Sequence, residues 1–289
     1  MPELPEVEVV KRSLTNKLKN LVIKKIKIND YRLRYPVNTK DIKSLIGLKI
    51  RKISRRSKYL IFFFKNNVAM LVHLGMSGKL FFVNKKNINH KTSFYYDLNE
   101  EKDKKYNRVI LTFSDNQKLV YNDVRKFGFI KILKNLELKT NLHLKNLGPE
   151  PLSKSLNFKY FKEYIAKKNR TIKDILMDQK FISGLGNIYA NEILFHSKIK
   201  PSRKTYTLKD KEVIKIILQT KKILKRAILL GGSSLKDFSS SDGKKGKFQD
   251  YFSVYGKKGE NCSNKNCNSN IIKTSLGNRA TFYCSRCQK

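Results

Sequence analysis

The first residues of the chain carry the types best suited to covalent chemistry. Removal of Met1, which is expected ahead of a small residue, would leave Pro2 with a free secondary amine. An α-amino group has a pKa of roughly 7.7–8.0, so a useful fraction of it is unprotonated near neutral pH. Attack of such an amine on an aldehyde-level carbon gives an iminium ion, an electron sink of the Schiff-base type. Glu3 could move protons beside that amine.

An inert N-terminal tail is the competing interpretation of this segment. Pro5 is typical of the first turn of a helix, where proline is tolerated. Apolar residues then recur at helical spacing, which predicts an amphipathic helix packed on a core; they are Leu4, Val7, Val10, Leu14, Leu18 and Leu21. Such a helix would hold Pro2 still, and an inert tail would not need this.

The composition predicts a polyanionic partner. The chain has 289 residues and a formal net charge of +40, from 63 Lys+Arg against 23 Asp+Glu. Nucleic acid is the usual partner of such an excess, through phosphate neutralisation and counterion release. The chain is also rich in Lys, Asn and Ile, as products of AT-biased genomes are, so we discount the size of the excess. No apolar run reaches the roughly 18 residues of a membrane span, and the acidic start is unlike a signal peptide, which favours a cytoplasmic protein.

Hydrophobic periodicity divides the chain into a β-rich part and a helical part. Short alternating or apolar segments between 22 and 133 predict two packed sheets. Helices are expected at 158–166, 171–177, 187–196 and 207–230, the last capped by Thr207. Polar stretches at 84–105 and 233–260 are expected to be long loops. The predicted fold class is α+β with two domains, an N-terminal β-sandwich and a C-terminal helical part.

Two glycine-flanked turns could reach into a DNA duplex. In the first turn the glycines would push Met76 outward as a wedge between bases, although filling a gap in the core is an equally good interpretation. In the second turn Arg125 could hydrogen-bond a base or phosphate, and Phe127 could stack on a base.

Two further positions suit a phosphate or a proton transfer. Lys58 ends a basic segment, and it is either a general acid or phosphate clamp near Pro2, or part of a solvated turn. Asn187 opens a predicted helix after Gly184 and Gly186, where unpaired N–H groups and the helix dipole favour an anion. Plain capping of the helix by Asn187 is the alternative, and it does not exclude the first interpretation.

The cysteines predict a metal site. All four fall near the end of the chain, as Cys262-x4-Cys267-x16-Cys284-x2-Cys287. Two thiolate pairs on a hairpin suit tetrahedral structural zinc, and four closed ligands leave no position open for catalysis. Arg279 would lie near the tip of that hairpin, where it could bind a phosphate.

Blocks of residues along nearly the whole chain together resemble the bacterial formamidopyrimidine-DNA glycosylase family. In order, they are 1–8, 56–59, 73–78, 125–128, 147–151, 184–190, 231–238, 241–243, 254–259 and 279–284. The resemblance implies a helix–two-turn–helix bundle and a zinc finger behind the sandwich. The implied domains are a catalytic sandwich at 1–135, a linker at 136–156, a helix–two-turn–helix domain at 157–232, a lesion-recognition loop region at 233–260 and a zinc finger at 261–289.

The resemblance also implies the reaction. It implies a monomer with one structural Zn²⁺ and no organic cofactor, which excises oxidised purines, 8-oxoguanine and formamidopyrimidines, from double-stranded DNA. Cleavage at the abasic site by β,δ-elimination would follow. Pro2 would be the Schiff-base nucleophile on C1′, with Glu3 as a proton donor. Lys58 and Arg279 would be the proton donors for β- and δ-elimination.

The implied DNA contacts include departures from the family's pattern. The residues implied to fill the gap left by the flipped nucleotide are Met76, Arg125 and Phe127. Asn187 and Arg279 would grip phosphates beside the lesion. Tyr106 stands where a DNA-contacting His is common, and Asn169 stands where a Lys is common, with Arg170 as a possible substitute. Val124 replaces the usual Pro before Arg125, and the first cysteine pair is spaced x4 where x2 is usual.

Two other functions compete with this one. An endonuclease VIII-like glycosylase for oxidised pyrimidines would share the fold; Leu4, the turn that carries Arg125 and Phe127, and the 233–260 loop favour the purine branch. A non-catalytic zinc-ribbon DNA-binding protein would bind DNA without chemistry.

Overall fold

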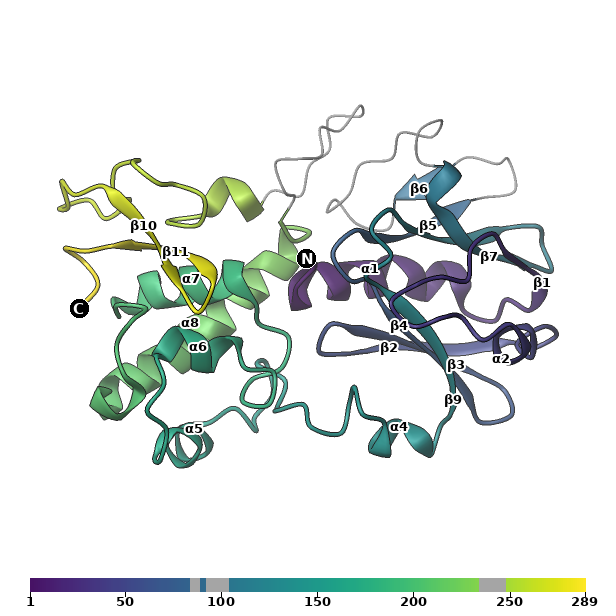
Figure 1. Ribbon diagram of the computed structural model, residues 1–289, viewed down its shortest axis with the longest axis horizontal. Helices are drawn as coiled ribbons and strands as arrows, with labels where there is room; N and C mark the ends of the chain where they lie inside the picture. Colours follow the sequence, from purple (N-terminus) through teal and green to yellow (C-terminus); the bar gives the residue numbers. More distant parts are fainter. Residues whose placement is uncertain (84–88, 92–103, 234–247) are drawn as a thin grey trace. The chain divides into compact units, whose positions relative to one another are not determined.

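The computed structural model describes residues 1–83, 89–91, 104–233 and 248–289 (Figure 1). The chain forms two compact units, Met1–Lys145 with Leu230–Lys247, and Asn146–Leu229 with Phe248–Lys289. Most of the two predicted loops, 84–88 with 92–103 and 234–247, lies outside the described residues. The five-part domain division given above stays a prediction.

Two antiparallel sheets make up the first unit. The five-stranded sheet has the order β1 (Ile23–Ile28), β7 (Asn107–Phe113), β8 (Lys118–Asp123), β5 (Gly78–Val83) and β6 (Asn89–Lys91). The four-stranded sheet has the order β2 (Ile50–Arg56), β3 (Tyr59–Phe64), β4 (Val68–His73) and β9 (Phe129–Lys134). Short helices interrupt the connections; they are α2 (Thr39–Lys43), η1 (Lys104–Tyr106) and α4 (Glu137–Thr140).

Helix α1 (Leu4–Leu18) anchors the N-terminus to the core of this sandwich. Its buried face joins apolar side chains from both sheets, among them Phe62 of β3 and Phe113 of β7. The helix contributes Val7, Val10, Leu14 and Leu18, each 1% exposed or less. Each such burial contributes about 1.5–3 kcal/mol, so detaching the helix would be costly. The amphipathic helix and the two sheets expected from periodicity are confirmed.

The second unit is built from helices and a hairpin. Its helices are α5 (Phe158–Ile165), α6 (Ile172–Met177), α7 (Asn187–Ser197) and α8 (Asp210–Leu229), with short turns η2 (Thr205–Thr207) and η3 (Phe248–Tyr251). The hairpin consists of β10 (Ile271–Leu276) and β11 (Arg279–Cys284). Helix α7 is buried on nearly all sides, against α8 and β11. No helix among the residues described above is long and apolar enough to cross a bilayer.

The start of α8 differs from the prediction. The helix begins at Asp210, and Thr207 belongs to the preceding turn, where its hydroxyl donates to the carbonyl of Lys204 at 2.8 Å. The side chain of Glu212 accepts the N–H of Lys209 at 2.8 Å instead. The expected capping by Thr207 is therefore wrong, because Glu212 reaches back over the first turn.

A buried carboxylate ties helix α7 to the segment before the zinc finger. Glu192 is 1% exposed and accepts the backbone N–H groups of Ser253, Val254 and Tyr255 at 2.8–3.0 Å. Burial raises the pKa of Glu192 even though these three donors favour the charged form. The chain entering the zinc finger is thus held by hydrogen bonds to one side chain.

His73, at the end of β4, is held in its neutral form. Its Nδ1 accepts the N–H of Gly75 at 3.2 Å, which requires that nitrogen to be unprotonated. The ring packs against Tyr59 and Phe129, with centroid distances of 4.9 and 5.5 Å. Burial first, and then the charge of Lys58, lowers the pKa of His73 to about 4.

This pKa predicts a loss of stability in mild acid. The unfolded chain takes up a proton at His73 near pH 6.5, whereas the folded chain does so near pH 4, so the stabilisation present above pH 6.5 is lost as the pH falls between these values. Between pH 7 and pH 5 we expect wild type to lose about 2 kcal/mol more free energy of unfolding than His73→Asn, measured by urea titration. Asn retains an acceptor for Gly75 but does not titrate. Equal pH dependence in the two proteins would refute this account.

Candidate active site and zinc centre

The N-terminus is seated in the first unit. Pro2 and Glu3 are buried, and Met1 is 39% exposed. The N–H of Glu3 donates to Oε2 of Glu6 at 2.9 Å across the first turn of α1. The segment is therefore part of the packed structure, which argues against an inert tail.

Glu6 also binds the chain that follows α8. Its Oε1 accepts both the N–H and the hydroxyl of Ser233, at 2.9 and 3.0 Å. Gly232 has a φ of +79° and lies so close that a Cβ there would be 3.1 Å from Oε1 of Glu6. Sequence reasoning did not select Glu6, although the Glu3-x-x-Glu6 spacing of a capping box was a usable signal.

Lys58 follows a strained turn that is braced from helix α1. Ser57 has a φ of +55°, an uncommon conformation for a residue with a side chain. The guanidinium of Arg55 donates to the carbonyl of Ser57 and to Oε2 of Glu8, both at 2.9 Å. Lys58 itself is 7% exposed, which argues against a solvated turn.

The chain's amino group lies in the electrostatic field of the predicted catalytic groups. Burial lowers the pKa of the Met1 amine; Glu3 and Glu6 raise it, and Lys58 and Arg125 lower it further. The charges of Glu3 and Lys58 therefore influence the pKa of this amine, and their roles in proton transfer stay predictions. In this structure the amine belongs to Met1, and it stands in for the nitrogen that Pro2 would present after Met1 is removed.

The two predicted wedge turns are linked. The hydroxyl of Ser77 donates to Oδ1 of Asp123 at 2.5 Å and accepts the N–H of Arg125 at 2.9 Å. Gly75 has a φ of +60°, and a Cβ there would be 2.4 Å from the carbonyl carbon of Phe127. Glycine is therefore needed for the two backbones to approach this closely.

The side chains on these turns face outward. Met76 and Phe127 are 42% and 45% exposed, so Met76 does not fill a gap in the core. The guanidinium carbon of Arg125 lies 4.7 Å from the centroid of the Phe127 ring, within range of a cation–π interaction. Tyr106, in η1, lies 5.6 Å from the guanidinium of Arg108 in the same manner.

Asn187 and Arg279 lie near one another in the second unit. Asn187 is the first residue of α7, and Gly186 is the N-cap, so the predicted capping by Asn187 is wrong. Its Nδ2 instead donates to the carbonyl of Ala280 at 2.9 Å. Lys173, 1% exposed, donates to the same carbonyl at 3.0 Å, and its own burial lowers its pKa to about 8. Arg279 is exposed on the strand directly before this anchored carbonyl.

Asn169, which follows α5, is exposed, and the side chain of its neighbour Arg170 already has hydrogen-bond partners. Arg170 donates to Oδ2 of Asp178 at 2.7 Å and to the carbonyl of Asp174 at 3.3 Å. Arg170 therefore braces the local structure of the second unit, which argues against its substitution for the Lys that is common at position 169.

The four cysteines converge as a metal site. Their sulfurs, from Cys262, Cys267, Cys284 and Cys287, all lie within 4.8 Å of one another. The Sγ–Sγ distances are 3.8 Å for Cys262 with Cys287 and 3.6 Å for Cys267 with Cys284. Tetrahedral zinc with Zn–S bonds of about 2.3 Å needs sulfurs ~3.8 Å apart, so the donor set fits structural Zn²⁺. The x4 spacing of the first pair is compatible with this geometry.

Comparison with known proteins gives the same result for both halves of the chain. The family model described as the formamidopyrimidine-DNA glycosylase N-terminal domain matches residues 1–130, and the one described as the formamidopyrimidine-DNA glycosylase H2TH domain matches residues 147–239. The formamidopyrimidine-DNA glycosylase of Rickettsia bellii is 40% identical over 289 residues, covering 100% of both chains. That of a Wolbachia from Brugia malayi is also 40% identical over 289 residues, with the same coverage.

Solved structures with a similar fold come from the same family. A point mutant of the Lactococcus lactis enzyme, in complex with DNA containing Fapy-dG, has a TM-score of 0.85 and 33% identity, with 100% of both chains covered. The complex of the L. lactis enzyme with DNA containing an abasic site also has a TM-score of 0.85 and 33% identity, with 99% of both chains covered. Full-length identity at this level, together with a matching fold and cysteine cluster, establishes that the chain belongs to the formamidopyrimidine-DNA glycosylase family.

Proposed function

We propose that this protein removes oxidised purines from double-stranded DNA and then cuts the strand, with Pro2 as the nucleophile. Base-excision glycosylase and lyase activity follows from its family. The observation that supports the residue assignment is the buried start of the chain, where the charges of Glu3, Glu6 and Lys58 shift the pKa of the amino group. We further propose that the protein acts as a monomer on nucleoid DNA in the bacterial cytoplasm.

The proposed reaction begins with removal of Met1. The lone pair of the Pro2 nitrogen then attacks C1′, the glycosidic C–N bond breaks, and the base leaves with a proton. The proton lost by the amine is the one that leaves with the base. Opening of the sugar ring, in which Glu3 donates a proton to the ring oxygen, then gives a cationic iminium. Lys58 and Arg279 then donate protons in β- and δ-elimination.

The proposed DNA contacts fall into two groups, those that fill the space left by the flipped base and those that bind phosphates. Extrusion of a base costs a few kcal/mol, so side chains must occupy the vacated space. We assign this to the exposed side chains on the two linked turns, which are Met76, Arg125 and Phe127. Phosphates beside the lesion are assigned to Asn187 and Arg279, with Tyr106 and Asn169 as further contacts.

Oxidised pyrimidines are the second candidate substrate. The structure of the L. lactis enzyme with DNA containing an oxidised pyrimidine, whose TM-score is 0.84, motivates this alternative. Side-by-side nicking of 8-oxoguanine and thymine glycol duplexes separates the two candidates. Faster cutting at 8-oxoguanine supports the purine assignment, and preference for thymine glycol contradicts it.

Borohydride trapping tests the nucleophile. Protein whose intact mass shows loss of Met1 should form a covalent adduct with an abasic duplex, and protein that retains Met1 should not. Glu3→Gln should slow excision about 10²–10⁴-fold, because it removes the proton donor beside the amine. A non-catalytic DNA-binding protein would give no adduct with any form. Full activity with Met1 retained would contradict the assignment to Pro2.

Removal of zinc should unfold the hairpin while the sandwich remains folded. Structural sites of this type bind Zn²⁺ with apparent free energies of about 10–16 kcal/mol, and this energy is folding energy. We expect one Zn²⁺ per chain by metal analysis, and loss of DNA binding after chelation or in Cys267→Ser. Ser263→Ala, an exposed change between the first two ligands, is the matched control. Full binding by zinc-free protein would disprove a structural role for the metal.

A further inference from the structure

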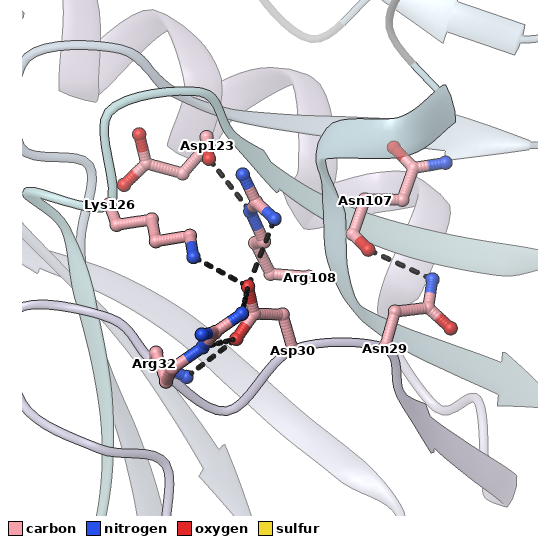
Figure 2. A network of polar contacts seen from close by, with 7 residues as sticks. All are labelled: Asn29, Asp30, Arg32, Asn107, Arg108, Asp123 and Lys126. Carbon is pink, nitrogen blue, oxygen red and sulfur yellow. Dashed lines mark hydrogen bonds and ion pairs between the residues drawn. The ribbon is translucent and has the colours of Figure 1, made fainter.

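Asp30 lies at the centre of a cluster of cations in the first unit (Figure 2). Its carboxylate binds Lys126 at 2.7 Å, Arg32 at 3.0 Å and Arg108 at 3.2 Å. The side chain of Asp30 is only 11% exposed. Arg32 first, and then Lys126, holds the pKa of Asp30 well below its usual range, so the carboxylate stays charged. These contacts join the end of β1, the start of β7 and the turn after β8.

Arg108 connects Asp30 to the backbone of Asp123. Its Nε donates to the backbone carbonyl of Asp123 at 2.9 Å, and its Nη1 donates to Oδ2 of Asp30 at 3.2 Å. The carboxylate of Asp123 is buried and accepts the N–H of Gly128 at 2.9 Å. Asp123 therefore holds both ends of the turn. It binds Gly128 directly, and it binds Ser77, whose hydroxyl accepts the N–H of Arg125.

The middle of this turn depends on Asp30. Lys126 has a φ of +58°, in the left-handed region that residues with a side chain rarely adopt. Its ammonium is bound to Asp30, so the ion pair compensates for an unfavourable backbone conformation. The residues on either side are Arg125 and Phe127, whose side chains contact each other. Without Asp30, the strained residue between the two wedge side chains would lose its tether. The hydrogen bonds from Ser77 and Asp123 would then hold the turn alone and would open more often.

We propose that Asp30 is a positioning residue that presets the turn carrying Arg125 and Phe127, so that both side chains enter the gap left by a flipped nucleotide without first being ordered. This rests on the proposed function, and it adds a residue that does not itself touch the DNA. Presetting matters because each side chain or loop that must be immobilised on binding reduces the net free energy gained. Asp30 reaches the turn through its ion pair with Lys126, so neutralising it should affect lesion excision more than DNA affinity.

The test uses the full-length, zinc-loaded protein with Asp30→Asn, which retains shape and loses charge. Asp41→Asn is the matched control, because it removes one carboxylate from exposed α2 in the same unit. We expect Asp30→Asn to slow single-turnover excision of 8-oxoguanine about tenfold with affinity for undamaged duplex within about twofold, and Asp41→Asn to change neither. Added to an Arg125→Ala/Phe127→Ala background, Asp30→Asn should have no further effect.

Amide hydrogen exchange of the free protein tests the same proposal without catalysis. The N–H groups of Arg125 and Gly128 donate to Ser77 and Asp123, and we expect both to exchange about tenfold faster in Asp30→Asn, because the turn they hold is no longer tethered at Lys126. Unchanged exchange, an additive loss of excision in the double-alanine background, or tighter binding of undamaged DNA with normal excision would each overturn the proposal. If wild type excises nothing, the proposed function fails, and the exchange result still decides whether Asp30 orders the turn.

Discussion

The carboxylate of Glu6 is the contact on which the arrangement of the site depends. It is 1% exposed, and it binds the first turn of α1 through one oxygen and Ser233 through the other. A buried charge is tolerated only when hydrogen bonds replace its hydration, which Glu3 and Ser233 provide here. The start of the chain is therefore held by the polar contacts of Glu6 as well as by the apolar face of α1.

The scarce carboxylates of this basic chain are placed where they brace cationic turns. With 63 Lys+Arg against 23 Asp+Glu, cations far outnumber carboxylates, and their mutual repulsion works against compact turns. Glu8 binds Arg55, which supports the turn before Lys58. Asp30 holds Lys126 beside the exposed Phe127. In the second case the brace lies beside an exposed side chain, and in both cases it offsets repulsion between cations in a turn.

The sequence alone predicted the features that depend on residues close together in the chain. Alternation predicted the two sheets, helical spacing predicted α1, and cysteine spacing predicted the metal site. It failed where the partner of a group is distant or unexpected. The bond between Glu6 and Ser233 spans 227 positions, which no periodicity contains. The cap of α7 was misassigned because Asn187 has a distant partner, the carbonyl of Ala280, that competes for its side chain. Tertiary contacts overrode local propensity in these places.

The four-cysteine cluster suits a structural metal site. Because all four thiols are close enough to share one tetrahedral ion, the metal has no open position for substrate, and its contribution is to fold the hairpin. That hairpin is also held from α6 and α7, where Lys173 and Asn187 both bind the carbonyl of Ala280. Arg279 immediately precedes this doubly bonded carbonyl, so its exposed side chain extends from a fixed backbone. The zinc unit therefore presents a cation from a fixed backbone.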